Sequence, residues 1–230
     1  MEHQLEQLAA RYDLTPRTVA QLRALLLYQA ADEHASTTVR APAAAADRHV
    51  ADSLVALDIP GVRAARRLAD LGAGAGWPGL ALAAALPGCH VALVESATRR
   101  CQYLSRAVDA AALTNVEVVH ARAEEWRAEA QDVVTARALA ALPVICEYAA
   151  PLLREGGILV AWKGHVPSAE AAAGARAAQA LGLSEPETVA VAPYPGAGPA
   201  SLVITRKVAP TPDRFPRRPG IALKRPLGSE

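Results

Sequence analysis

The stretch Arg67-Leu-Ala-Asp-Leu-Gly-Ala-Gly-Ala-Gly-Trp-Pro-Gly79 decides the fold, because a short apolar run leads into clustered glycines and then into an apolar pattern of helical spacing. This order predicts a strand, a tight loop and the start of a helix. Gly72, Gly74 and Gly76 carry no Cβ, so the loop can adopt positive φ and let a ligand approach its backbone. Pro78 suits the first turn of the helix. Loops of this kind typically hold a nucleotide.

Two nucleotide ligands are compatible with this loop. Gly74-Ala-Gly76-Trp-Pro-Gly79 satisfies the G-x-G-x-x-G pattern of dinucleotide-binding proteins, and Glu95 follows roughly 20 residues later, as that pattern expects. Asp70 favours S-adenosylmethionine instead, because a carboxylate at the strand end can face the ammonium of the methionine moiety but would repel a pyrophosphate. A nicotinamide-dependent oxidoreductase therefore stays open as an alternative at this point.

The composition indicates an intracellular globular protein. A chain of 230 residues with a formal net charge of +1 fits one domain of ordinary size plus an extension. Cys89, Cys101 and Cys146 have no Cys-x-x-Cys spacing, which argues against a disulfide framework or a zinc site and favours a reducing cytoplasm. The sequence shows neither a signal peptide nor an apolar run approaching about 18 residues. We expect a cytoplasmic monomer without a membrane partner and without a metal.

Strand and helix patterns alternate from Arg67 onward, which predicts a parallel, doubly wound sheet. The expected strands are 67–71, 90–94, 116–120, 132–135 and 158–162. The expected helices are 80–86, 98–113, 124–130, 144–153 and 169–181. Two further strands, 188–191 and 202–205, are joined without a helix, so we expect them to be antiparallel to each other and to complete a seven-stranded sheet.

Helical spacing also dominates the first part of the chain. Leu5, Leu8 and Tyr12 repeat at this spacing, Thr15-Pro16 marks a second helix start, and a further helix is expected over 48–57. We therefore predict an N-terminal helical extension (1–47), a central α/β domain (48–208) and a C-terminal tail (209–230). The tail is basic, because residues 206–225 hold seven Lys or Arg and one acid.

Acidic residues follow the second and third strands, at the edge where open α/β sheets bind ligands. Glu95 closes the second strand and can accept hydrogen bonds from a ribose diol. Glu124 and Glu125 follow the third strand, where a carboxylate can accept from an adenine amino group; this favours S-adenosylmethionine. The alternative is that these two acids only stabilise a helix N-terminus through its dipole.

Basic residues follow the next two strands. Arg137 and Lys163 at the same edge suggest an anionic substrate. His49, Asp52 and Ser53 lie at one-turn spacing, but adjacent helical positions are a poor geometry for a nucleophilic triad, so capping or packing is the preferred interpretation. Trp77 and Trp162 are either core residues or part of the cofactor pocket.

Six motifs in order resemble one known family. They are Arg48-His-Val-Ala-Asp-Ser-Leu54, Asp70 to Leu80, Ala121-Arg-Ala-Glu-Glu-Trp126, Thr135-Ala-Arg-Ala138, Trp162-Lys-Gly164 and Arg214-Phe-Pro-Arg-Arg-Pro-Gly220. Over most of its length the chain is similar to the bacterial ribosomal small subunit methyltransferase G family, also known as glucose-inhibited division protein B. The resemblance implies a class I S-adenosylmethionine-dependent methyltransferase with a Rossmann-like fold, whose substrate is guanine N7 in 16S ribosomal RNA or in the small ribosomal subunit.

The resemblance also implies site residues. Cofactor contacts are expected at Gly72, Trp77, Ala123, Glu124 and Arg137; the loop geometry adds Asp70, Gly74 and Gly76, and the strand geometry adds Glu95. Phosphate contacts are expected from Arg48, Lys163, Arg217, Arg218, Lys224 and Arg225, which would make RNA binding fall with salt. The family pattern is interrupted at Ala200-Ser201 and within the tail from Gly220 to Leu227.

The chemistry of the expected reaction needs no general base, because guanine N7 is a lone-pair acceptor that carries no proton. We expect catalysis by alignment of the reactants, with no certain catalytic residue and with His49, Asp52 and Lys163 as candidates for positioning. Three alternatives remain: a methyltransferase for a small molecule or a protein, the oxidoreductase, and a non-catalytic RNA-binding protein.

Overall fold

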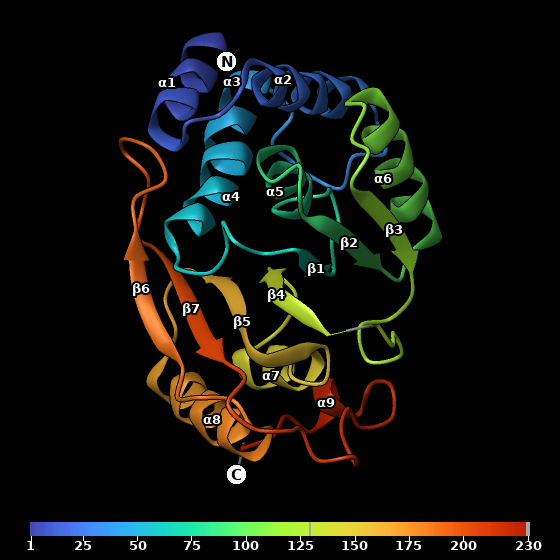
Figure 1. Ribbon diagram of the computed structural model, residues 1–230, viewed down its shortest axis with the longest axis vertical. Helices are drawn as coiled ribbons and strands as arrows, with labels where there is room; N and C mark the ends of the chain where they lie inside the picture. Colours follow the sequence, from blue (N-terminus) through green and yellow to red (C-terminus); the bar gives the residue numbers. More distant parts are fainter. Residues whose placement is uncertain (129, 229–230) are drawn as a thin grey trace.

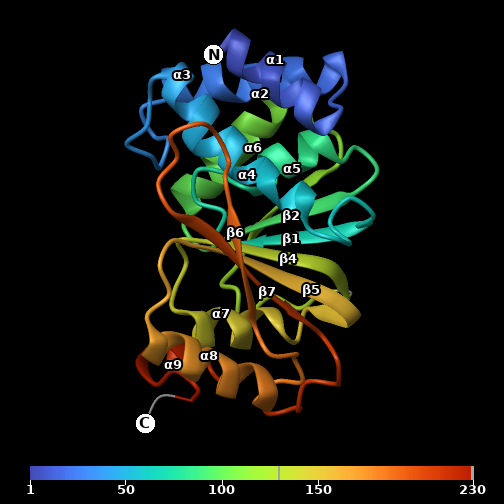
Figure 2. The same ribbon diagram turned by 90° about the vertical axis from the view of Figure 1, so that its left-hand side faces the viewer.

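The computed structural model describes residues 1–128 and 130–228, which form one sheet between two layers of helices (Figures 1 and 2). The helices are α1 (Glu2–Tyr12), α2 (Pro16–Ala31), α3 (Pro42–Ala45), α4 (Asp52–Leu54), α5 (Gly79–Ala85), α6 (Thr98–Ala110), α7 (Leu142–Ala149), α8 (Ser168–Ala180) and α9 (Ile221–Lys224). The strands are β1 (Arg67–Leu71), β2 (His90–Glu95), β3 (Val116–His120), β4 (Gln131–Arg137), β5 (Leu153–Lys163), β6 (Glu187–Val191) and β7 (Ala200–Arg206). Figure 2 shows α1 to α6 on one face of the sheet and α7 to α9 on the other.

The strand order is β3-β2-β1-β4-β5-β7-β6. β7 runs antiparallel to both of its neighbours, and the other strand pairs are parallel. This confirms the predicted seven-stranded sheet and the predicted antiparallel pairing of its last two strands. The chain winds outward in opposite directions from β1 and β4, so the crevice beyond their carboxyl ends is the expected position for a ligand.

The N-terminal helices pack onto the helix layer that covers β1 and β2. Thr15 caps α2 as predicted, because its side chain accepts a hydrogen bond from the backbone N–H of Thr18. The buried leucines of α1 and α2 belong to the same apolar cluster as those of α5. Burial of a leucine side chain contributes about 1.5–3 kcal/mol, so this contact holds the extension firmly to the sheet.

Two predicted helices differ from the structure. The expected helix 124–130 is wrong for its described part, which forms a turn in which Glu125 and Trp126 both donate to the carbonyl of Arg122. The Glu124 carboxylate accepts a hydrogen bond from the backbone of Gly220 rather than stabilising a helix start. The expected helix 48–57 exists but is irregular, with a π-helical turn (Ala46–Ala51) before α4 and a 3₁₀ turn (Val55–Asp58) after it. In the described part of the chain, no helix has the length and apolar character required to cross a membrane.

Candidate functional site

Asp70, the fourth residue of β1, holds the glycine loop through hydrogen bonds to its carboxylate. One carboxylate oxygen accepts from the backbone N–H of Gly79 at 2.9 Å, and the other accepts from the Thr135 hydroxyl at 2.8 Å. The side chain is buried, and burial raises the pKa of Asp70 to about 6, against the effect of these two hydrogen bonds. Both oxygens are therefore engaged within the protein, and the carboxylate joins the end of the glycine loop to β4.

A cavity lies beyond the carboxyl ends of β1, β2 and β3. It is lined by Gly72, Val94, Glu95, Ser96, Arg100, Ala121, Arg122, Ala123, Glu124, Ala138, Leu139, Tyr148 and Leu223. Four of the residues predicted to bind a cofactor are brought together there: Gly72, Glu95, Ala123 and Glu124. The other predicted cofactor residues, Asp70, Gly74, Gly76, Trp77 and Arg137, lie outside this lining.

Glu95 lines the cavity, and its carboxylate also holds the surrounding backbone in place through hydrogen bonds. One carboxylate oxygen accepts from the backbone N–H groups of Ser96 and Ala97 at 2.8 and 2.9 Å, and the other accepts from Gly74 at 3.0 Å. The N–H of Gly74 therefore points to the carboxylate, which fixes the loop beside the end of β2. A carboxylate oxygen can accept more than one hydrogen bond, so Glu95 keeps capacity for hydroxyl groups of a ligand.

Three features of the cavity fit a bound polar ligand. Gly72 has a φ of +68°, and an added Cβ would lie 2.6 Å from Leu139 Cδ1, so the position requires glycine and presents bare backbone. The hydroxyl of Tyr148 is buried and has no hydrogen-bond partner among the described residues. The carboxylate of Glu124 is also buried. Buried polar groups are normally hydrogen-bonded, so the Tyr148 hydroxyl has capacity for one further hydrogen-bond partner.

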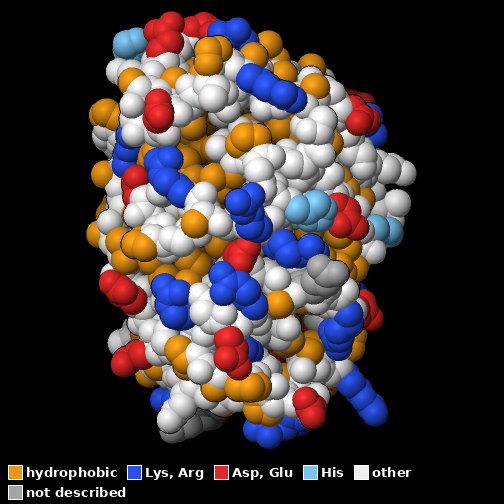
Figure 3. Space-filling model, viewed as in Figure 1, with side chains coloured by type: hydrophobic (Ala, Val, Ile, Leu, Met, Phe, Trp, Pro, Cys, Tyr) orange, Lys and Arg blue, Asp and Glu red, His pale blue; other side chains and the backbone are white. Residues whose placement is uncertain are grey.

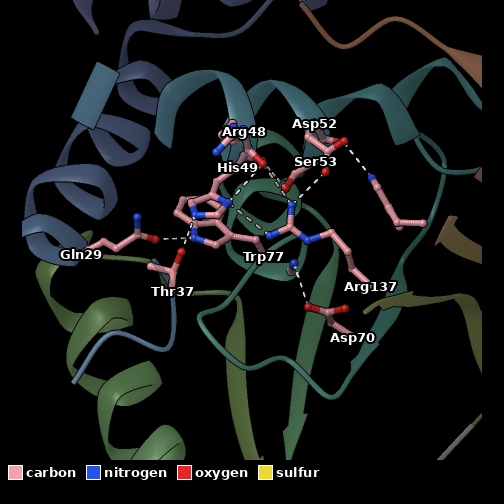
Figure 4. A network of polar contacts seen from close by, with 11 residues as sticks. Gln29, Thr37, Arg48, His49, Asp52, Ser53, Asp70, Trp77 and Arg137 are labelled. Atoms are coloured by element: carbon pink, nitrogen blue, oxygen red, sulfur yellow. Dashed lines mark hydrogen bonds and ion pairs between the residues drawn. The ribbon is translucent and has the colours of Figure 1, made fainter. Parts of the chain in front are cut away.

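Trp77 packs inside the protein beside Gln29 and His49 (Figure 4). Its indole N–H donates to the side-chain oxygen of Gln29 at 2.6 Å, and its ring stacks on His49 with 5.7 Å between the ring centroids. Only 4% of Trp77 is exposed. In this arrangement Trp77 ties the glycine loop to α2 and to the π-helical turn, and it offers no face to a cofactor or a flipped base.

Arg137 connects the end of β4 to the segment before β1. It donates to Asp52 Oδ2 at 2.8 Å, and its Nη2 lies 3.3 Å from His49 Nδ1 (Figure 4). Burial, followed by the Arg137 cation, lowers the pKa of His49 to about 4, so the imidazole is neutral near pH 7. Burial raises the pKa of Asp52, and Arg137 opposes that effect. The Ser53 hydroxyl donates to the carbonyl of His49 at 2.5 Å, which agrees with the prediction that no nucleophilic triad forms here.

A groove adjoins the cavity at Ala138, which lines both. We use "the groove" for two neighbouring hollows lined by Val39, Arg48, His49, Asp52, Arg137, Ala138, Ala140, Trp162, Lys163, Gly164, Val191, Pro193, Tyr194, Ala197, Gly198, Pro199, Ala200 and Ser201. It brings together the three predicted positioning residues His49, Asp52 and Lys163. Lys163 donates to Glu170 at 2.7 Å and to the carbonyl of Ala140 at 2.9 Å, so its cation is held in place.

Sequence reasoning missed the contribution of the loop between β6 and β7. Tyr194 and Pro199 line the groove, and the only signal for them was the cluster of prolines and glycines around the tyrosine. Sequence reasoning also missed Tyr148 and Leu223 in the cavity, because an apolar helix pattern does not reveal which of its residues meets a ligand. Figure 3 shows several basic side chains spread across the middle of one face of the molecule.

The predicted RNA-binding cations fall into two groups. Arg48, Arg218, Lys224 and Arg225 are exposed, whereas Lys163 and Arg217 are partly buried and paired with carboxylates. Arg217 instead forms a bidentate pair with Glu147, at 2.9 Å from Nε to Oε1 and 2.6 Å from Nη2 to Oε2, and the Glu147 side chain is 1% exposed. Its guanidinium is thus engaged in fastening the tail to α7, and a phosphate contact is not its role in this structure.

Comparisons with known proteins agree with this architecture. The family model described as rRNA small subunit methyltransferase G matches residues 19–193. A curated relative from Chloroflexus aggregans, named ribosomal RNA small subunit methyltransferase G, is 44% identical over 198 residues, which are 83% of this chain and 82% of the relative. The protein of the same name from Rubrobacter xylanophilus is 42% identical over 78% of this chain and 72% of its own.

A solved structure supports the fold. The SAM-dependent O-methyltransferase from Thermotoga maritima superimposes with a TM-score of 0.53 and 17% identity, over 70% of this chain and 66% of that one. The predicted class I methyltransferase fold is thereby confirmed. The family model and the two curated relatives each match most of the chain, and the chain therefore belongs to the rRNA small subunit methyltransferase G family.

Proposed function

We propose that this protein transfers the methyl group of S-adenosylmethionine to N7 of a guanine in 16S ribosomal RNA. The observation that carries the proposal is the junction at Ala138, where a cavity suited to an adenosyl ligand meets a groove that presents Arg48 and Lys163. A methyl donor in the cavity and a base in the groove would meet at this junction. Membership of the methyltransferase G family supports the choice of ribosomal RNA over a small molecule or a protein.

The cavity supplies the groups that an adenosyl ligand requires. Glu95 would accept hydrogen bonds from the ribose hydroxyls, Glu124 would accept from the adenine amino group, and the Tyr148 hydroxyl would gain the partner that it lacks. Gly72 would let the ligand approach the backbone closely. When bound, S-adenosylmethionine supplies an electrophilic methyl group on a sulfonium sulfur.

The residues around the groove can position a base without exchanging protons with it. His49 is neutral and hydrogen-bonded, Asp52 is paired with Arg137, and Ser53 donates to backbone. Guanine N7 carries no proton, so none of them has to act as a base. Catalysis then rests on holding N7 in line with the methyl group, and such positioning can contribute several orders of magnitude in rate. Tyr194 offers an aromatic side chain on which the base can stack.

The RNA must present its target guanine outside a regular helix. N7 faces the deep and narrow major groove of A-form RNA, which side chains cannot enter easily, so the target lies in an unpaired region or is turned out of its stack. The exposed cations Arg48, Arg218, Lys224 and Arg225 would contact the flanking phosphates. We further propose that the protein works as a monomer in the cytoplasm; its three cysteines are buried free thiols, which suits a reducing compartment.

The test uses labelled S-adenosylmethionine and small ribosomal subunits from cells that lack this modification. We expect label in 16S RNA, and mass spectrometry of the digested RNA should place it on guanine N7 at one position. A Gly72→Asp variant is the control and should transfer no label, because it places a carboxylate in the cavity. Label on another base position, or on metabolites or proteins but not on RNA, would overturn the proposal.

A further inference from the structure

The C-terminal segment (residues 214–225) reaches from the far helix layer to the cavity. In both ribbon views α9 lies beside α7, below the sheet (Figures 1 and 2). Leu223 of α9 lines the cavity together with Glu124 and Tyr148. A segment that carries basic residues on its outside is therefore also part of the surface around the cavity.

Two carboxylates anchor this segment. Glu147 receives the backbone N–H of Arg217 at 3.0 Å in addition to the bidentate guanidinium, and Arg217 also donates to the carbonyl of Arg225 at 2.8 Å. Glu124 receives the backbone N–H of Gly220 at 3.1 Å. Hydrogen bonds to charged groups contribute about 1.5–3 kcal/mol, so the segment is held in a defined position and not merely tethered.

Tyr148 lies between the two anchors. The charges of Glu124 and Glu147 act on it, and burial, the largest effect, raises the pKa of Tyr148 to about 12, which keeps the hydroxyl protonated. The Tyr148 side chain lines the cavity, and its buried hydroxyl has no partner among the described residues. One anchor, Glu124, thus lines the same cavity as Tyr148, and it marks the position expected for the adenine.

The exposure of its side chains shows which face of α9 packs against the rest of the protein. Ala222 is 3% exposed and joins the apolar cluster of α7, whereas Leu223 is 55% exposed and Ile221 is 36% exposed. Leu223 lines the cavity and Ile221 does not. A leucine that is half exposed in the free protein can bury apolar surface against a ligand in the cavity.

We propose that the C-terminal segment forms the wall at the adenine end of the cofactor site, with Leu223 and the Tyr148 hydroxyl as cofactor contacts. This inference rests on the proposed function for the identity of the cofactor.

The wall is tested by calorimetric titration of the full chain with S-adenosylhomocysteine. Leu223→Ala should weaken binding about fivefold, the equivalent of losing part of one buried leucine side chain. Tyr148→Phe, which removes only the hydroxyl, should weaken it by about three- to tenfold. Ile221→Ala is the matched control and should bind like the wild type, because it makes the same change on the same helix away from the cavity. Wild-type affinity in both Leu223→Ala and Tyr148→Phe would overturn the proposal that this wall contacts the cofactor.

These outcomes separate the inference from the proposed function. If the wild type binds S-adenosylhomocysteine but methylates no ribosomal RNA, the proposed function fails, and the comparison of Leu223→Ala with Ile221→Ala still decides the wall. If the wild type methylates RNA and both wall variants bind normally, the wall is wrong and the proposed function stands.

Discussion

Arg137 Nη1 and Asp52 Oδ2 lie 2.8 Å apart, although 85 residues separate them in sequence. The pair joins the end of β4 to the helical segment that precedes β1, at the side of the junction between the cavity and the groove. About one fifth of each side chain is exposed, so the ion pair is partly shielded from water. The pair therefore fixes both side chains in the lining of the groove.

The loss of this pair should lower both stability and activity. Arg137→Ala leaves the Asp52 carboxylate half-buried without its cation, so we expect a decrease of about 1–3 kcal/mol in the free energy of unfolding, measured with urea. RNA methylation should fall by two orders of magnitude or more, because misplacing the reactants is costly. Arg17→Ala, which removes an exposed arginine of α2, is the control and should change neither quantity. Wild-type turnover in Arg137→Ala would contradict a role at the junction.

Gly72→Ala should weaken cofactor binding. The residue has a φ of +68°, which costs a non-glycine residue roughly 1–2 kcal/mol, and the new Cβ would push Leu139, itself part of the cavity lining, out of its position. Calorimetry with S-adenosylhomocysteine should show at least a tenfold loss of affinity. Gly88→Ala lies in an exposed loop with only one atom near the added Cβ, at 3.9 Å, and should bind normally. Equal affinities of the two variants would argue that the loop does not touch the ligand.

His49 should make the protein less stable at acidic pH. Its pKa is about 4 in the folded state and about 6.5 when unfolded, so between these values the unfolded chain binds a proton that the folded chain does not. Stability is therefore lost as the pH falls from about 6.5 to about 4, by on the order of 2–3 kcal/mol. Urea unfolding at pH 7 and pH 5 should show a smaller decrease for His49→Asn than for the wild type.

Asp70 changes the stability in the opposite direction to His49 when the pH is varied in this experiment. Its raised pKa means that the folded chain holds a proton in the window from about 4 to about 6, so its contribution to stability falls as the pH rises. Asp70 is present in both proteins, and its effect cancels in the comparison. Parallel pH profiles for the wild type and His49→Asn would refute the assignment of the acid loss to His49.

The salt dependence of RNA binding should distinguish the exposed cations from Arg217. The Arg218→Glu and Lys224→Glu variants should each bind RNA more weakly and reduce the slope of log affinity against log salt, because each phosphate contact releases about one counterion. Arg217→Ala should chiefly lower stability, because it leaves the buried Glu147 carboxylate unpaired. Filter binding from low to high salt, together with thermal unfolding, checks both statements. A stable Arg217→Ala variant with a reduced slope would show that Arg217 contacts phosphate after all.

Local features of the fold were predictable from the sequence, because their causes lie close together along the chain. The alternation of strand and helix patterns predicted the sheet, and the glycines between Leu71 and Leu80 marked the loop and the start of α5. The positions of Glu95 and Glu124 at the cavity also follow from the sequence, because Glu95 ends β2 and Glu124 lies in the short segment after β3.

The remaining details depend on partners that are distant in sequence. The tryptophan of the glycine loop finds Gln29, 48 residues earlier, and therefore turns away from the ligand side. Glu124 meets Gly220, 96 residues later, which explains why a helix start predicted from two adjacent acids is a turn. Arg217 looks like any other cation of a basic tail until Glu147 is placed beside it. Periodicity and composition carry no information about such pairs.

Ala138 has consequences beyond its size. It has a positive φ of 54°, which branched side chains tolerate poorly, and it lines the cavity and both hollows of the groove. A single methyl group thus lies where the cavity meets the groove. A larger side chain such as valine or leucine would block this opening, so that a methyl donor in the cavity and a base in the groove could both bind but could not come into contact.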